Sequence, residues 1–258
     1  MMEISQRVSP KLSQTSNNIF LNEKLLARVK SIYDKKEQLN LSTEDAKLLE
    51  DLYESFKANG ATLNKDDKEK YRKLSMDLSM LTLQFDQNAL KDKNRFELLI
   101  TDENELSGLP ESARDAAAML AKSKDKNGWL FNLSAPSYIP FMRYSDKRDL
   151  REKMYREYMS VGNKGDEFDN KDIIKKIVNI RLEIAQLMGF KNYAEYALEH
   201  TMAKNSANVY KLLNQLLEAY KPIAINEYNA VEGFALGTEK ENITVMPWDW
   251  SYYSEKLR

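Results

Sequence analysis

A long helix is the feature that most constrains this fold. Between residues 71 and 85, apolar side chains recur at every third or fourth position, which places them on one face of an α-helix. The series consists of Tyr71, Leu74, Leu78, Leu81 and Phe85. Asn64 can cap the helix start, so we expect a helix from Asn64 to about Leu90 that packs lengthwise against another helix.

Glycine and proline are scarce, with 8 and 6 among 258 residues, which favours helices over a turn-rich β architecture. Ser42 and Asp45 resemble a capping box, and Asn59-Gly60 can end the helix that they open. Pro222 should kink or interrupt the helix that contains it. Besides the helix at 64–90, the pattern predicts helices over 23–39, 43–58, 110–122, 146–160, 171–188 and 206–233 and a last helix capped by Asp249.

Two short apolar runs, 96–101 and 129–133, are bounded by turn residues and predict strands that pair as one small ribbon. The two prolines in 135–140 predict a rigid, extended connector. The expected fold is therefore mostly α, a helical bundle-like body with one small two-stranded β element. We divide it into a helical part at 1–93, a strand-helix-strand insertion with its Pro-rich connector at 94–145, and a helical part at 146–258, all within one structural domain.

Several kinds of site are excluded by the residues themselves. The chain has no cysteine and a single histidine, His200, so it can hold neither a disulfide nor a zinc site built on two histidines. Its glycines form no nucleotide-binding pattern, and no apolar run is long enough to cross a membrane. The net charge of −1 argues against nucleic acid or an anionic membrane as a partner. We therefore assign no catalytic and no metal-binding residue.

Three polar features have ordinary structural interpretations. His200 follows a helix and is expected to be partly exposed rather than catalytic. The acidic stretch at 166–172 lacks the spacing of an EF-hand and is expected to be a solvated loop. The basic stretch at 143–156 has tyrosines that could stack on bases. It also has acidic residues three or four positions away, so a salt-bridged helix face is favoured.

Aromatic residues are densest near the C-terminal end of the sequence. Large aromatics with polar groups are favoured at ligand channels and interfaces, and they serve equally well in a core. The candidate substrate-channel residues are Trp248, Asp249, Tyr252 and Tyr253. The helix that carries them has no stop signal before Arg258, which suggests an interrupted element.

Five stretches carry a family resemblance, in order from about Ser9 to Arg258. They are SPKLSQTSNNIFLNEKLLARVKSIYDKK, LSMLTLQFDQNALKDKNRFELLITDENELSGLPES, WLFNLSAPSYIPFMRYSDKRDLREKMYREYMSVG, NKDIIKKIVNIRLEIAQLMGFKNYAEYALEHTMAKN and PWDWSYYSEKLR. Together they resemble the thimet-oligopeptidase family of zinc metallopeptidases, and most of all its peptidyl-dipeptidase (dipeptidyl carboxypeptidase) branch.

The resemblance implies a hydrolase with two mostly helical halves around a deep channel, which releases dipeptides from the C-terminus of unfolded oligopeptides. It also implies a zinc ion held by an H-E-x-x-H helix and a further Glu. This sequence has no H-E-x-x-H, so none of those residues can be carried over. We expect an inactive fragment that forms the channel wall, binds no zinc itself and has the missing catalytic half and oligopeptides as partners.

A stand-alone helical protein-interaction module without enzymatic activity is the alternative, with the face at 71–85 as its partner surface. A fragment can also self-associate through apolar faces that the absent half would cover. The absence of cysteine and of a signal peptide fits a cytoplasmic location.

Overall fold

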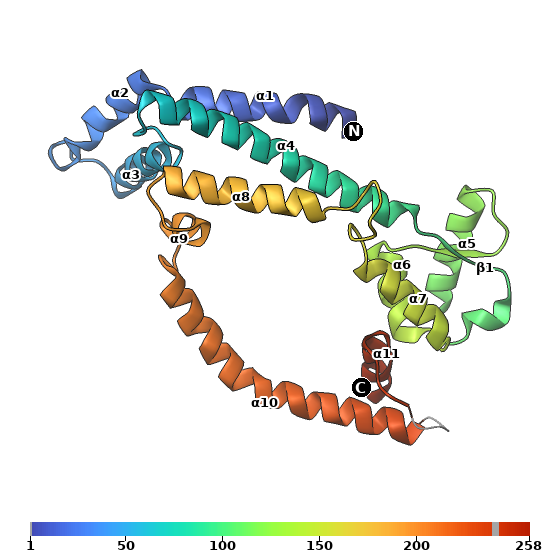
Figure 1. The fold of residues 1–258 in the computed structure, drawn as a ribbon. Helices are drawn as coiled ribbons and strands as arrows, with labels where there is room; N and C mark the ends of the chain where they lie inside the picture. Colours follow the sequence, from blue (N-terminus) through green and yellow to red (C-terminus); the bar gives the residue numbers. More distant parts are fainter. Residues whose placement is uncertain (1, 239–242) are drawn as a thin grey trace. The chain divides into compact units, whose positions relative to one another are not determined.

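The computed structural model describes residues 2–238 and 243–258 (Figure 1). Within these residues it has eleven α-helices, two short 3₁₀-helices and one two-stranded antiparallel sheet, which confirms the predicted fold class. None of the described helices combines the length and the hydrophobicity needed to cross a membrane. The α-helices are α1 (Met2–Phe20), α2 (Glu23–Tyr33), α3 (Thr43–Ala58), α4 (Lys65–Arg95), α5 (Glu111–Ser123), α6 (Ala135–Tyr144), α7 (Arg148–Met159), α8 (Lys171–Leu187), α9 (Tyr193–Leu198), α10 (Ser206–Thr238) and α11 (Pro247–Leu257).

Contacts divide the chain into two compact units, each built from two separate stretches of sequence. Unit 1 comprises residues 1–87 and 171–210, and unit 2 comprises residues 88–170 and 211–258. Helices α4 and α10 each contribute residues to both units. These two units do not correspond to the three parts expected from the sequence, 1–93, 94–145 and 146–258. That three-part division stays a prediction.

In unit 1 the long helix packs as its periodicity predicts. Tyr71 and Leu74 on α4 form a buried cluster with Ile184 on α8, and Leu78 packs against the cluster from α4. Figure 1 shows α8 running alongside this part of α4. The part of this face at 71–78 is therefore an internal helix–helix contact, which counts against its use as the partner surface of an interaction module.

Side-chain caps explain where the helices of unit 1 begin. The Oδ1 atom of Asn22 accepts backbone N–H groups at the start of α2, at 2.9 and 3.1 Å. Ser42 Oγ accepts the N–H of Asp45 at 3.1 Å before α3, and Asn64 Oδ1 accepts the N–H of Asp67 at 2.9 Å before α4. Gly60 has φ +81°, the left-handed conformation predicted after α3.

Helix α1 was not among the elements predicted from the pattern. Its contacts with α4 are mainly polar: Gln6 donates to Gln87 at 2.8 Å, and the hydroxyls of Ser9 and Ser79 lie 2.9 Å apart. A polar interface of this kind produces no apolar stripe between two helices, so the periodicity of the sequence does not reveal it.

Unit 2 has its core around the small sheet. Strands β1 (Leu98–Ile100) and β2 (Trp129–Phe131) pair antiparallel, with Leu98 opposite Phe131, as predicted. Their buried side chains join residues of α6, α7 and α11 in one apolar cluster that includes Phe141, Met154 and Trp248. The sheet and α7 therefore hold α11 in place.

Three local predictions differ from the structure, one of them only in part. Residues 135–144 form helix α6 and not an extended connector, because Pro136 lies in the first turn, where no backbone N–H is needed. Helix α10 is not interrupted at Pro222, although Figure 1 shows that it bends along its length, so of the predicted kink or interruption only the interruption is wrong. Met246 is the N-cap residue of α11, and Asp249 lies one turn inside, where its carboxylate accepts the N–H of Met246 at 3.1 Å.

Candidate functional site

The four candidate channel residues lie together on α11 in unit 2, and all four are buried. Trp248 packs into the cluster around the sheet, whereas Tyr252 and Tyr253 pack against Val231 and Ala235 of α10. Tyr252 and Tyr253 also contact each other edge to face, with ring centroids 5.1 Å apart. The structure thus brings these residues together as packing groups, and their contact with substrate stays a prediction.

Asp249 is the centre of a buried ionic network between α7 and α11. Its carboxylate is fully buried, and it accepts hydrogen bonds from Arg151 at 2.8 Å and from Arg148 at 2.7 Å. Burial acts to raise the pKa of Asp249, but the hydrogen bonds from Arg148, Arg151 and the Met246 N–H outweigh it and lower the pKa below its ordinary value. Asp249 therefore stays ionised and fixes α11 on α7.

Arg151 is equally enclosed, with a side chain only 1% exposed. Its guanidinium also donates to the carbonyl of Ser145 at 2.7 Å and lies 4.0 Å from the centre of the Tyr252 ring. A planar guanidinium can make these contacts at once because its donors lie in a fixed fork and its face can stack on an aromatic ring. Arg151 thus joins the carboxylate to the aromatic residues of α11.

A second carboxylate, Asp146, accepts hydrogen bonds from side chains of α11. The hydroxyl of Tyr252 donates to Asp146 at 2.7 Å, and the hydroxyl of Ser107 donates at 2.6 Å. Burial acts to raise the pKa of Asp146, but these hydrogen bonds together with Lys256 lower it. Burial is also the main reason that the pKa of Tyr252 is raised, so Tyr252 remains a protonated donor at neutral pH.

The basic stretch at 143–156 behaves only partly as its spacing predicts. Glu152 and Arg156 form the expected pair one turn apart, at 2.7 Å. Arg148 and Arg151 instead reach Asp249, about 100 residues farther along the chain. Sequence spacing missed this network because a helical pattern reports only neighbours on the same helix.

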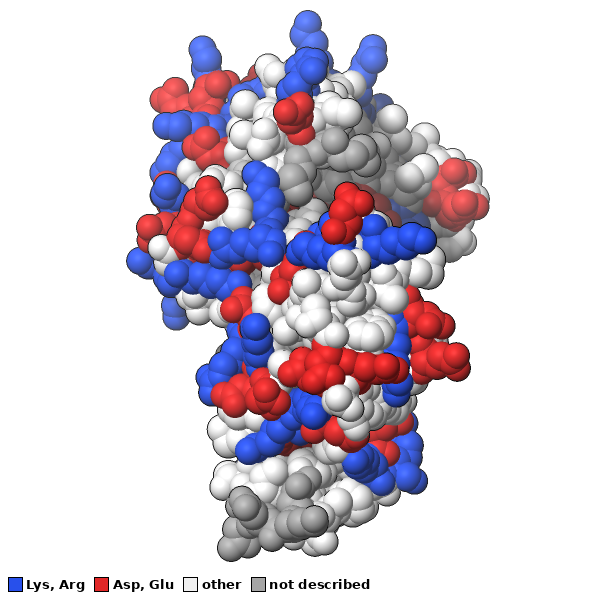
Figure 2. Space-filling view, turned by 90° about the vertical axis from the view of Figure 1, so that its right-hand side faces the viewer, with Lys and Arg blue, Asp and Glu red and all other residues white. Residues whose placement is uncertain are grey.

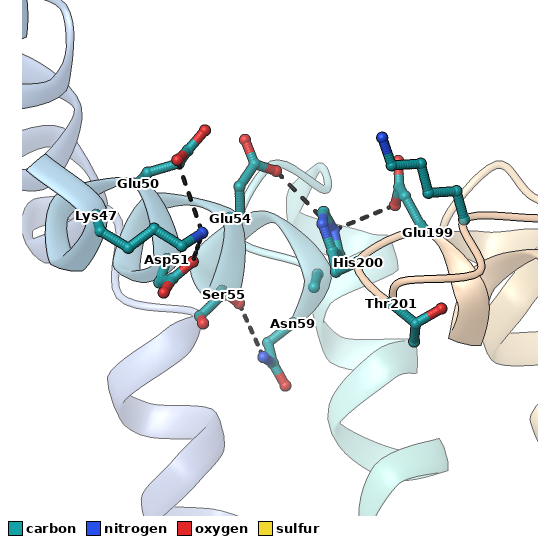
Figure 3. Close-up of a pocket in the computed structure, with 11 residues that line it drawn as sticks. Lys47, Glu50, Asp51, Glu54, Ser55, Asn59, Glu199, His200 and Thr201 are labelled. Atoms are coloured by element: carbon teal, nitrogen blue, oxygen red, sulfur yellow. Dashed lines mark hydrogen bonds and ion pairs between the residues drawn. The ribbon is translucent and has the colours of Figure 1, made fainter.

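In unit 1, His200 lines a polar pocket of about 600 Å³ between α3 and the segment after α9 (Figure 3). Its Nε2 atom lies 3.3 Å from Glu199 and 3.9 Å from Glu54, and its side chain is partly exposed, as predicted. On the α3 side, Lys47 pairs with Asp51 at 2.7 Å. Four of the eleven residues of the pocket wall are carboxylates and two are lysines, so the wall carries more acidic than basic groups.

The acidic loop also has local partners. Asp166 forms an ion pair with Arg95, and Asp169 accepts the N–H of Gly165 at 2.6 Å. Beside this loop, the buried carboxylate of Asp92 accepts the N–H of Gly162 at 2.7 Å. These contacts fix the loop to the end of α4, while Asp166 and Glu167 stay exposed as expected for a solvated loop.

The residues of this chain do not fit the zinc site that the resemblance implies. Across the described ranges, no group of three or more His, Cys, Asp or Glu side chains is arranged to hold a metal ion. His200 has two carboxylate neighbours, Glu54 and Glu199, at ion-pair distances. Glu54 also forms an ion pair with Lys57. We therefore derive no catalytic step through a metal for this chain.

Comparison with known proteins reveals relatives along the whole chain. Residues 141–258 match the profile of Peptidase family M3. The chain is 34% identical to oligopeptidase A of Escherichia coli and 35% identical to that of Haemophilus influenzae, in each case over all of this chain and 38% of the relative. It is 29% identical to dipeptidyl carboxypeptidase of Escherichia coli, with the same coverage.

The chain thus spans only about two fifths of the length of these relatives. The higher identities are to proteins named oligopeptidase A, so the dipeptidyl carboxypeptidase branch is not singled out. Together the profile match and the relatives show that this chain is similar to part of the peptidases of family M3, among them proteins named oligopeptidase A and dipeptidyl carboxypeptidase.

Proposed function

We propose that this chain forms the non-catalytic wall of the peptide channel in a zinc metallopeptidase that releases C-terminal dipeptides from oligopeptides. One observation carries the proposal: the entire chain aligns with oligopeptidases, yet it accounts for only 38% of their length. A single histidine and no cysteine leave the chain without an H-E-x-x-H motif, so the zinc ligands would come from the remaining part of the parent protein.

The chain's own contribution is a rigid surface. A channel wall must hold its shape while peptides enter and leave, and the network around Asp249 and Arg151 supplies that rigidity to unit 2. Because Trp248, Tyr252 and Tyr253 are buried, we propose that they support the wall from within and that their neighbours on α11 face the peptide.

We propose a cytoplasmic location for the parent protein. An Arabidopsis thaliana relative, 35% identical over 89% of this chain, is named probable cytosolic oligopeptidase A, which supports this location.

A chimeric enzyme tests the proposed function. In it, this chain replaces the matching 38% of Escherichia coli oligopeptidase A, and hydrolysis of a synthetic octapeptide is followed by mass spectrometry. We expect the folded chimera to hydrolyse the peptide in a chelator-sensitive manner. The chain alone should release no product and bind no stoichiometric zinc.

The products separate the two levels of the proposal. Release of dipeptides from the C-terminus of the peptide supports the peptidyl-dipeptidase activity. Cleavage at internal bonds contradicts that activity but is still consistent with a parent protein that is an oligopeptidase. A folded but inactive chimera, or hydrolysis by the chain alone, would overturn the channel-wall function. An inactive chimera would leave the stand-alone interaction module as the better account.

A further inference from the structure

Helix α10 exposes an unusual amount of apolar surface. All residues from 211 to 230 are exposed, and they include four leucines, two isoleucines and two tyrosines. Leu213 is 52% exposed and Leu217 is 60% exposed. Soluble proteins rarely leave a contiguous apolar patch of this extent uncovered unless it is an interaction site.

The exposed residues on one side of α10 form a regular stripe, which we call the α10 stripe. Its members are three or four positions apart and therefore lie on one face of the helix. They are Leu213, Leu217, Tyr220, Ala224 and Tyr228. The next two positions in the same register are Val231 and Ala235.

Those two positions are already covered. Val231 is 4% exposed, Ala235 is fully buried, and both pack against Tyr252 and Tyr253 of α11. Figure 1 shows α11 near the C-terminal end of α10. At the join between the covered and uncovered parts, the ring of Tyr228 stacks on Trp250 at 5.9 Å. The stripe therefore continues an existing helix–helix interface beyond the point where α11 ends.

Pro222 gives an independent reason to expect a covering partner. A proline inside a helix costs about 3 kcal/mol because it removes a backbone hydrogen bond and crowds the preceding turn. Pro222 lies in the middle of the exposed stretch of α10, between Tyr220 and Ala224 of the stripe. A helix with this defect needs packing to stabilise it, and α11 packs only near its C-terminal end.

We propose that the α10 stripe is the docking face for an apolar helical segment from the part of the parent peptidase that has no counterpart in this chain. This inference rests on the proposed function. It commits to that occupant because the uncovered stripe continues the α10–α11 interface, and because more than half of the length of the oligopeptidase relatives lies outside the match. Leu213 and Leu217 are the anchors of the contact.

Thiol labelling can test the contact, because this chain contains no cysteine of its own. Leu217→Cys and Ala224→Cys each place a single thiol on the stripe. Asn226→Cys is the matched control, since Asn226 is exposed and lies about 180° around the helix from Leu217, on the side opposite the stripe. Each variant is labelled with a maleimide, and the intact mass of the chain is followed with and without the unmatched part of Escherichia coli oligopeptidase A.

We expect the three variants to react at similar rates alone. In the complex, labelling at positions 217 and 224 should slow by about tenfold or more, while position 226 stays within about twofold. A complex without this protection overturns the docking face and leaves the proposed function intact. No complex by size-exclusion chromatography counts against the proposed function itself. Protection that rises with the concentration of the chain alone identifies a second copy as the occupant and overturns the inference.

Discussion

Replacing Asp249 by asparagine removes one negative charge from a site that two arginines share. The change keeps the size of the side chain, so its effect reports on charge and hydrogen bonding more than on packing. Arg151 is 1% exposed and would be left without a carboxylate partner. Arg148 would lose the same carboxylate partner, but its side chain is 43% exposed, so water can solvate its charge and reduce the cost.

The expected cost follows from that difference in exposure. Breaking a buried ion pair on one side costs about 3–5 kcal/mol, because the remaining charge is left uncompensated. With a urea dependence of about 2 kcal/mol per molar for a unit of this size, the unfolding midpoint of unit 2 should fall by about 2 M. Arg151 would account for most of this loss.

Tryptophan fluorescence can isolate the effect, because Trp129, Trp248 and Trp250 all belong to unit 2. Urea unfolding of Asp249→Asn is compared with that of Asp149→Asn, an exposed acid on the adjacent helix α7. The control should lose no more than about 1 kcal/mol, the value of a charge near a helix start.

The pH dependence has a definite sign. Because its pKa is lowered in the folded state, Asp249 contributes stability above its unfolded pKa of about 3.9 and loses it as the pH falls through the folded value. The difference in unfolding free energy between the native chain and Asp249→Asn should therefore become smaller below about pH 4.

Two outcomes would refute this reasoning. One is a midpoint shift in Asp249→Asn no larger than that in Asp149→Asn. The other is found in the double variant Asp249→Asn/Arg151→Met, which replaces the uncompensated cation by an apolar side chain. It should recover part of the lost stability, and a further loss would show that the buried guanidinium is not the source of the cost.

Two pairs of substitutions, one pair in each unit, test the packing. Gly108→Ala should destabilise unit 2 by at least about 2 kcal/mol in fluorescence-monitored unfolding, because Gly108 has φ +83° and the new Cβ would meet the carbonyl of Tyr144. Its control, Gly165→Ala, has φ +72° but open space around it and should cost only about 1 kcal/mol. Ile184→Ala should lower the stability of unit 1 by about 2–4 kcal/mol in circular dichroism melts, whereas Ile174→Ala, at a 46% exposed position on the same helix, should cost well under about 1 kcal/mol. Equal losses within either pair would contradict the packing described here.

Much of the fold follows from signals that act within a few residues. Asn22, Ser42 and Asn64 begin their helices by accepting N–H groups two or three positions ahead, so the caps could be predicted directly. The pairing of α4 with α8 also follows, because each helix carries its own apolar stripe.

The features that were missed depend on partners that are distant in sequence. Asp249 looks like a helix cap when only its neighbours are considered, and its pairing with Arg151 follows from the tertiary fold alone. The proline-containing segment at 135–144 is helical because Pro136 falls in the first turn, a position that depends on where the preceding strand ends.

The pairing of Arg151 with Asp249 also affects how the chain folds during its synthesis. The two residues are separated by 98 positions, and ribosomes add about 5–20 residues per second, so Arg151 is made roughly 5–20 s before its partner. Through that interval, Arg151 on helix α7 is without its carboxylate partner, and the apolar cluster lacks Trp248. Unit 2 therefore completes its core only when α11 has left the ribosome, and until then the apolar surface that Trp248 covers is open to aggregation.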